Sequence, residues 1–236
     1  PTMCDDHECT CHDDFDDYDC GCEDFYHELP RLGEPAPEFI AETTHGEIKL
    51  SDYRDKKWVV LFSHPADFTP VCTTEFVAFS KAYPEFEKRN VALIGLSVDS
   101  LSSHLAWVRD IEEKIGVHVP FPVIADLDTS VASLYGMIQP AMSTTVACRA
   151  VFFIDPKGIL RAMIYYPLTT GRCIADILRV IDALQVTDTH HVATPANWKP
   201  GGKVIVPAPQ TQKEMEEREK ITGPDKKAWY LLMKDL

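Results

Sequence analysis

The chain lacks any long uninterrupted run of apolar residues. Of its 236 residues 45% are hydrophobic, yet no apolar run approaches the ~20 residues that a membrane-spanning helix needs. The N-terminus is acidic and shows no apolar segment of the kind found in a secretory signal. We therefore expect no membrane span, and we expect the protein to be cytoplasmic.

Basic residues are also scarce, with 23 Lys and Arg against 37 Asp and Glu and a net charge of −14. The imbalance is local, because residues 1–28 hold eleven acids and no Lys or Arg. Subtracting these eleven from the 37 acids leaves 26 acids against 23 bases for the rest of the chain. Neither part offers the basic patch that nucleic acid or an anionic membrane would need, so we expect no nucleic-acid partner.

Cysteine is nearly absent outside the N-terminal segment. Of eight cysteines, the three beyond residue 28 are Cys72, Cys148 and Cys173. Thiols so far apart do not form a disulfide scaffold, which favours a reducing compartment. The other five, which include two C-x-C units, are Cys4, Cys9, Cys11, Cys20 and Cys22.

Residues 1–28 are predicted to be an acidic tail, because they have almost no aliphatic side chains with which to fold alone. Their cysteines and histidines are ligand types for zinc, iron or copper. The spacing matches neither a zinc finger nor an EF-hand. Three alternatives stay open: a flexible tail, a metal site on these cysteines, or tail thiols that resolve or regulate Cys72.

The most informative stretch runs from His64 to Phe76, between an apolar segment predicted as a strand (58–62) and an aromatic pattern predicted as a helix. Cys72 falls at the first turn of that helix. Unpaired backbone N–H groups and the positive end of the helix dipole favour a thiolate there. The stretch therefore predicts a nucleophilic cysteine, whose alternative is a buried structural thiol.

Three blocks of sequence carry a family resemblance. The string Pro65-x-x-x-Thr69-x-x-Cys72 resembles the active-site signature of the peroxiredoxins, and the fuller string from Phe62 to Glu75 resembles their one-cysteine subfamily. The block from Arg149 to Arg172 supports this resemblance, and the segment 192–198 (VATPANW) is similar to the C-terminal extension of that subfamily. The similarity covers about residues 30–210. It implies a thiol-dependent peroxidase that reduces hydrogen peroxide and organic hydroperoxides through a cysteine sulfenic acid, with no cofactor required.

The resemblance also implies roles for individual residues. Cys72 is the expected peroxidatic nucleophile and Arg149 the cation beside it, while Thr69 would hydrogen-bond the peroxide and Pro65 would shape the pocket. The expected supporting residues are Glu75, which would orient an arginine, a second arginine at Arg172, and His64 beside the pocket.

Resolution of an oxidised Cys72 is less well defined. No cysteine follows Cys173, so the C-terminal resolving cysteine of two-cysteine relatives is absent. Cys148 neighbours Arg149 on a predicted strand and should therefore face away from Cys72. Cys173 starts a predicted helix and is either buried or reactive. An external thiol reductant is the first expectation.

Two other chemistries lack their motifs. No Gly-x-Ser-x-Gly string is present, and Ser63 and His64 are adjacent on an extended segment, so a serine triad is not expected. A disulfide isomerase is disfavoured because Cys72 has no C-x-x-C partner.

The pattern of elements predicts an α/β fold. Strands are expected near residues 39–40, 48–50, 58–62, 91–98, 122–125, 150–154, 159–165 and 203–206, and helices after Cys72 and at 100–115, 129–135 and 171–184. Pro84 should kink or end its helix. The resemblance implies a thioredoxin-like fold, a central mixed sheet flanked by helices, with a small C-terminal arm domain.

Three regions are therefore predicted: the tail at 1–28, a peroxidase domain at 29–186 and a dimerisation arm at 187–236. The resemblance implies a homodimer or a ring of dimers. Two rival functions remain, a redox-sensing holdase assembly triggered by Cys72 and a metal-binding protein that acts through its tail.

Overall fold

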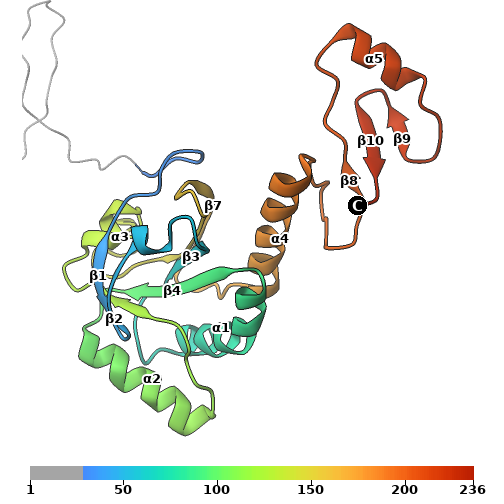
Figure 1. The fold of residues 1–236 in the computed structure, drawn as a ribbon. Helices are drawn as coiled ribbons and strands as arrows, with labels where there is room; N and C mark the ends of the chain where they lie inside the picture. The colour runs from blue at the N-terminus through green and yellow to red at the C-terminus, as the bar shows by residue number, and fades with distance from the viewer. Residues whose placement is uncertain (1–28) are drawn as a thin grey trace, which may run out of the picture.

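The computed structural model describes residues 29–236, so the predictions for the tail lie outside the described residues. The elements, shown in Figure 1, are β1 (Ile40–Thr43), β2 (Gly46–Lys49), the 3-10 helix η1 (Leu50–Tyr53), β3 (Trp58–Ser63), α1 (Pro70–Lys88), β4 (Val91–Ser97), α2 (Leu101–Ile115), β5 (Val123–Ala125), α3 (Ser130–Leu134), β6 (Arg149–Ile154), β7 (Leu160–Tyr166), α4 (Ile174–His190), β8 (Val204–Ile205), α5 (Gln212–Glu219), β9 (Lys226–Ala228) and β10 (Leu231–Lys234).

Seven strands form the central sheet, in the order β2-β1-β5-β4-β3-β6-β7. The inner strands β3, β4 and β5 run parallel, whereas β6 pairs antiparallel with β3 and with β7. Strand β1 pairs antiparallel with β2 and β5. The predicted mixed sheet flanked by helices is confirmed, and it is the thioredoxin-like arrangement that the resemblance implied.

The sheet divides the hydrophobic core in two. Along β3, Val59 and Leu61 belong to one cluster and Val60 and Phe62 to the other, as expected where successive side chains of a strand point to opposite faces. Helices α1, α2 and α4 contribute to the cluster of Val60 and Phe62. Helix α3 contributes to the cluster of Val59 and Leu61.

Helix α1 contains Pro84 and continues to Lys88, so of the two predicted effects of Pro84, a kink or an end of the helix, the end is wrong. A proline inside a helix costs roughly 3 kcal/mol because a backbone hydrogen bond is lost. Beyond it, Phe86 is fully buried in the core, and Arg89 binds Asp182 of α4 through Nε and Nη2 at 2.6 and 3.0 Å. These contacts offset the cost of the proline.

The boundaries of α2 follow their sequence signals. Ser100 accepts a hydrogen bond from the backbone N of Ser103, and Gly116 ends the helix in the left-handed conformation with φ of 75°. The hairpin of β6 and β7 is also as predicted, and its turn is held by Asp155, whose Oδ1 accepts from the backbone N of Lys157 and Ile159.

The C-terminal arm is more regular than the sequence indicated. Helix α5 covers most of the charged segment at 213–220, and β8, β10 and β9 form a second sheet. In Figure 1 the arm stands apart from the main sheet and is joined to it through α4. The predicted domain boundary at residue 186 falls inside α4, which ends at His190.

Within residues 29–236, no helix is both long and apolar enough to cross a membrane.

Candidate active site

Cys72 is the third residue of α1, whose N-cap is Thr69 and whose first residue is Pro70. Proline fits there because the first N–H groups of a helix have no intrahelical acceptor. The Cys72 side chain is fully buried among the aromatic residues of the α1 face. The sulfur therefore meets the positive end of a 19-residue helix inside the protein.

Arg149 supplies a full positive charge to this sulfur. It begins β6, is only 3% exposed, and its Nη1 lies 3.3 Å from Cys72 Sγ. The same Nη1 lies 2.8 Å from Glu75 Oε2, and Nε donates to Leu168 O at 2.8 Å. The guanidinium is thus fixed on two sides, and its contact with the sulfur does not depend on a mobile side chain.

Glu75, one turn after Cys72, holds two arginines. Arg172 donates to it three times, from its backbone N (2.8 Å) and Nε (2.9 Å) to Oε1 and from Nη2 (2.7 Å) to Oε2. Burial acts to raise the pKa of Glu75, but the hydrogen bonds and charge of Arg172 and the charge of Arg149 outweigh it and hold that pKa below its ordinary value. Glu75 is therefore an anion that fixes both guanidinium groups.

Arg172 also packs against aromatic rings. Its guanidinium carbon lies 5.3 Å from the ring centroid of Phe62 and 5.7 Å from that of Phe79. Nη1 donates to Ala150 O at 2.8 Å. Residues 171–173 lie outside α4, which begins at Ile174 and not at the predicted residue 171.

Thr69 and Pro65 lie in the loop between β3 and α1, and both are half-buried. The Thr69 hydroxyl donates to Ala66 O at 2.7 Å. Its hydrogen is therefore committed to the loop, which leaves the lone pairs of the oxygen as acceptors. The sequence predicted that this hydroxyl lies near the sulfur, and that stays a prediction; the structure shows which hydrogen-bonding role remains open to the hydroxyl.

His64 is fully buried, and its Nε2 lies 2.8 Å from Asp67 Oδ1. Burial lowers the pKa of His64, and the hydrogen bond and charge of Asp67 only partly oppose it. Its neighbour Ser63 has different partners, donating to Cys148 O at 2.6 Å and accepting from Ala150 N at 3.1 Å. The two side chains therefore form no serine–histidine pair.

The other two cysteines are placed differently. Cys148 is buried in the cluster on the opposite face of the sheet from Cys72, as its position beside Arg149 predicted. Burial raises the pKa of its thiol. Cys173 is the N-cap of α4 and is exposed, so of the two alternatives given for it, burial is wrong.

Sequence reasoning missed a polar cluster next to this site, formed by Asp67, Ser103 and His104. Asp67 Oδ2 accepts from Ser103 Oγ at 2.8 Å and lies 2.7 Å from His104 Nδ1. A signal was present, because His104 shares helical spacing with the buried Trp107 and Ile111 on the apolar face of α2. An imidazole on the buried apolar face of a helix needs a buried hydrogen-bond partner.

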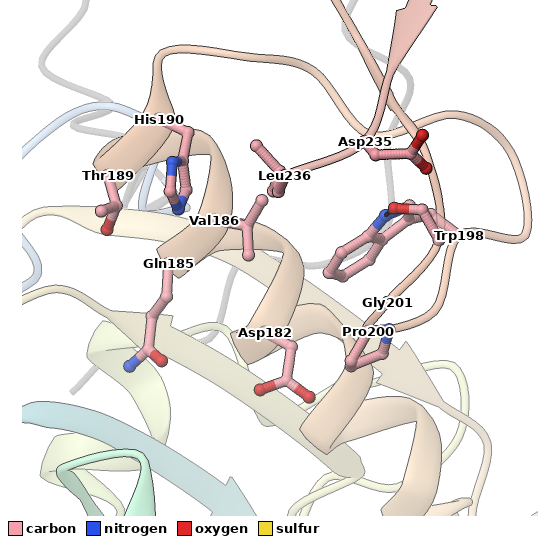
Figure 2. A pocket seen from close by; sticks show the side chains of 11 residues that line it. Asp182, Gln185, Val186, Thr189, His190, Trp198, Pro200, Gly201, Asp235 and Leu236 are labelled. Carbon is pink, nitrogen blue, oxygen red and sulfur yellow. Dashed lines mark hydrogen bonds between the residues drawn. The ribbon is translucent and has the colours of Figure 1, made fainter.

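A cavity of about 290 Å³ lies elsewhere, between the C-terminal half of α4 and the arm. Figure 2 shows Val186 of α4 on the side of the helix that faces the C-terminal Leu236 and Trp198 of the arm. None of its lining residues belongs to the cluster around Cys72.

Comparison with known proteins agrees with this geometry. The family model described as AhpC/TSA matches residues 32–163, and the model for the C-terminal domain of 1-Cys peroxiredoxin matches residues 183–220. A peroxiredoxin of Aquifex aeolicus is 59% identical over 216 residues, which cover 87% of this chain and 97% of the relative. The chain belongs to the peroxiredoxin family.

Further relatives support the assignment. Peroxiredoxin 2 of Caldanaerobacter subterraneus is 59% identical over 207 residues, covering 87% of this chain and 93% of the relative. The solved structure of a yeast mitochondrial 1-Cys peroxiredoxin aligns with a TM-score of 0.77 at 45% identity, over 88% of this chain and all of that one. This peroxiredoxin is a peroxidase, an oxidoreductase that acts on peroxide.

Proposed function

We propose that this peroxiredoxin reduces hydrogen peroxide and small organic hydroperoxides through Cys72. The thiolate attacks one peroxide oxygen, so that an S–O bond forms while the O–O bond breaks. The other oxygen takes a proton and leaves as water or as an alcohol. Cys72 is oxidised by two electrons to the sulfenic acid, and the peroxide is reduced by the same two electrons.

The fixed position of Arg149 supports this proposal most strongly. Its Nη1 lies 3.3 Å from Cys72 Sγ, so its positive charge favours the thiolate in the resting enzyme. The same guanidinium is suited to stabilise the negative charge that develops on the departing oxygen. Because Glu75 and Leu168 O already hold it, little reorganisation is needed when that charge develops.

Thr69 would orient the peroxide. Since its hydroxyl hydrogen is given to Ala66 O, the oxygen is suited to accept a hydrogen bond from the O–H of a hydroperoxide. Pro65 shapes the same loop. The steps need only these side chains, a peroxide and a reductant, without a cofactor.

An external thiol completes the cycle. A first thiol would attack the sulfenic sulfur, releasing water and leaving a mixed disulfide, and a second would displace Cys72 and restore its thiol. Cys148 is suited to neither step, because it lies in the cluster behind the sheet. The yeast mitochondrial 1-Cys peroxiredoxin has a thiol resolving mechanism via glutathione and thioredoxin systems, and thiols of these two kinds are the reductants to test.

We also propose a homodimer or a ring of dimers. Strand β7 is the last strand in the order of the main sheet. Its first residue, Leu160, exchanges backbone hydrogen bonds with Gly33 and Glu34, but within residues 29–236 no further strand lies along its outer edge, and an edge strand can pair with another chain. The match of residues 183–220 to the C-terminal domain of 1-Cys peroxiredoxin supports a role for the arm in dimerisation. Sedimentation velocity of the reduced protein tests the assembly, and a monomer at all concentrations would contradict it.

Trapping the oxidised cysteine tests the chemistry. The reduced full chain is exposed to one equivalent of hydrogen peroxide or of tert-butyl hydroperoxide in the presence of dimedone, which captures sulfenic acids. Peptide mass spectrometry should place the adduct on Cys72, with water or tert-butanol as the product. An adduct only on Cys173, or none on Cys72 with either peroxide, would contradict the proposal.

A further inference from the structure

The loop between β3 and α1 is anchored at its centre by Asp67, whose side chain is 1% exposed. The carboxylate is bonded to His64 of the loop and to Ser103 and His104 of α2. The backbone N of Asp67 donates to Asp99 Oδ2 at 3.1 Å. One residue therefore ties the loop that carries Pro65 and Thr69 to the first turns of α2.

His104 joins the loop to the sheet through both of its ring nitrogens. Its Nε2 lies 3.0 Å from Ile124 O of β5, and its Nδ1 lies 2.7 Å from Asp67 Oδ2. Burial acts to raise the pKa of Asp67, but the hydrogen bonds of His104 and His64 outweigh it and hold that pKa far below its ordinary value. The carboxylate is therefore ionised and accepts hydrogen bonds from the groups around it.

The distances within this cluster fit hydrogen bonds better than they fit the ligands of a metal ion. One ligand atom from each of His64, Asp67 and His104 lies within 4.8 Å of the others, which is compatible with a metal site. However, the two nitrogen–oxygen distances, 2.8 and 2.7 Å, are those of charge-assisted hydrogen bonds. Ligands about 2.0–2.2 Å from a central zinc ion in tetrahedral geometry stand farther apart, at about 3.3 Å.

The residue after Asp67 shows why the anchor matters. Phe68 has a φ of 56° and is exposed, a backbone conformation that is uncommon for a bulky residue and persists only where its surroundings enforce it. Thr69 follows directly as the N-cap of α1. If the anchor were lost, Phe68 would relax to a negative φ, and the Thr69 oxygen would move relative to Cys72.

We propose that Asp67, through its buried hydrogen bonds to His64, Ser103 and His104, is the positioning residue for Thr69 in the reaction with peroxide. This inference rests on the proposed function for its kinetic part only. Its spectroscopic part concerns the resting protein and stands whether or not peroxide is the substrate.

Nitrogen-15 NMR of the histidine rings tests the contact between Asp67 and His104 in the full chain. The chain has nine histidines, and the signals missing from His104→Asn assign the ring of interest. The Nδ1 signal of His104 should shift in Asp67→Asn, because the carboxylate that it bonds is replaced by an amide. An Nδ1 signal that is the same in both proteins, or signals of His64 and His104 that shift with one equivalent of added zinc, would overturn the proposal.

Two reagents separate positioning from folding. We expect Asp67→Ala to lower the rate of Cys72 oxidation by hydrogen peroxide roughly 10- to 100-fold, with little change in the rate of Cys72 alkylation by iodoacetamide, which needs no orientation by Thr69. Asp67→Asn retains donors or acceptors for His64, Ser103 and His104, so it should recover most of the peroxide rate.

The contrary results are equally specific. If Asp67→Ala changes the two rates in parallel, its effect is structural; if the peroxide rate is unchanged, Asp67 does not position Thr69. If Asp67→Ala does not fold, the NMR result and Asp67→Asn decide, since loss of the peroxide rate in folded Asp67→Asn would contradict an anchoring role. If the proposed function is wrong, the wild-type protein itself will react slowly with peroxide. That result differs from every outcome above, each of which compares a variant with a fast wild type.

Discussion

Two buried cysteines, Cys72 and Cys148, lie on opposite sides of one sheet, and their surroundings differ sharply. They are 0% and 2% exposed. Cys72 lies at a helix N-terminus with Arg149 Nη1 at 3.3 Å, whereas the pKa of Cys148 is raised by burial, which its own backbone hydrogen bond and the charge of Arg172 only partly oppose. Burial is common to both thiols, so in the proposed mechanism the positioned cation, and not burial, makes one of them reactive.

The contrast originates in the alternation of a single strand. Cys148 and Arg149 are consecutive, so their side chains leave the backbone toward opposite faces. Arg149 reaches the Cys72 cluster and Cys148 packs in the other. A shift of one residue in register would exchange the two faces.

Replacing the thiols should show the largest difference. Cys72→Ser removes the nucleophile, and we expect peroxide consumption to fall by at least about 10³-fold, as when an essential nucleophile is lost. Cys148→Ser is the matched control and should keep most of the wild-type rate. Consumption of peroxide with excess thiol reductant measures both. Equal losses of peroxide consumption in the two variants would show that the two thiols do not differ in function.

Removing the cation should make Cys72 resemble Cys148. Arg149→Met leaves the sulfur without its charged donor, and we expect the oxidation rate to fall roughly 10²- to 10³-fold, the scale of one lost electrostatic donor. Arg149→Lys keeps the positive charge but loses the planar guanidinium, so its oxidation rate should lie between those of the wild type and Arg149→Met. Single-turnover oxidation followed by intrinsic fluorescence provides the rates. A wild-type rate in Arg149→Met would show that the helix terminus suffices.

Neutralising Glu75 should lower the oxidation rate of Cys72 less than removing Arg149 does, but it should clearly lower the free energy of unfolding. In Glu75→Gln the arginines lose the anion that holds them, so we expect roughly a tenfold slower oxidation and a free energy of unfolding lower by about 3 kcal/mol, because two buried cations become uncompensated.

The stability difference should depend on pH. The pKa of Glu75 in the folded state is below its ordinary value of 4.5, so its stabilising effect is complete above that value and is lost as the pH falls through the folded-state pKa. Urea unfolding of both proteins at a series of acidic pH values measures this. The gap should narrow toward acid; a gap that widened would mean that Glu75 is protonated in the native state.

The smallest expected effect concerns Cys173. It is exposed at the start of α4, so a thiol reagent should label it readily in the native protein while Cys148 stays protected. Cys173→Ser should leave the first oxidation of Cys72 almost unchanged. Peptide mapping after brief labelling reports the order. Fast labelling of Cys148 would mean that the hydrophobic cluster around it is transiently exposed to solvent.

Much of the fold could be predicted because the local signals agree with the tertiary structure. Ser100 and Gly116 mark the ends of α2, and the turn at Asp155 fixes the hairpin. The end of α1 could not be predicted, since Pro84 is a local signal whereas the burial of Phe86 and the contact of Arg89 with Asp182 are long-range.

The site shows the same limit. Cys72 and Glu75 are one helical turn apart and could be paired from sequence, but Arg149 and Arg172 meet them across 77 and 97 residues and were placed by resemblance. Asp67 and His104 are 37 residues apart, and no motif joined them. Only the packing of α2 beside the loop shows that they form one unit.

Stopped-flow mixing of the reduced full chain with hydrogen peroxide measures the rate at which Cys72 is oxidised. It tests whether the residues around Cys72 make this thiol react faster than an ordinary one. We predict oxidation many times faster than that of free cysteine at the same pH, absent in Cys72→Ser and retained in Cys148→Ser. Oxidation no faster than that of free cysteine would contradict the role assigned to Arg149 and the helix terminus.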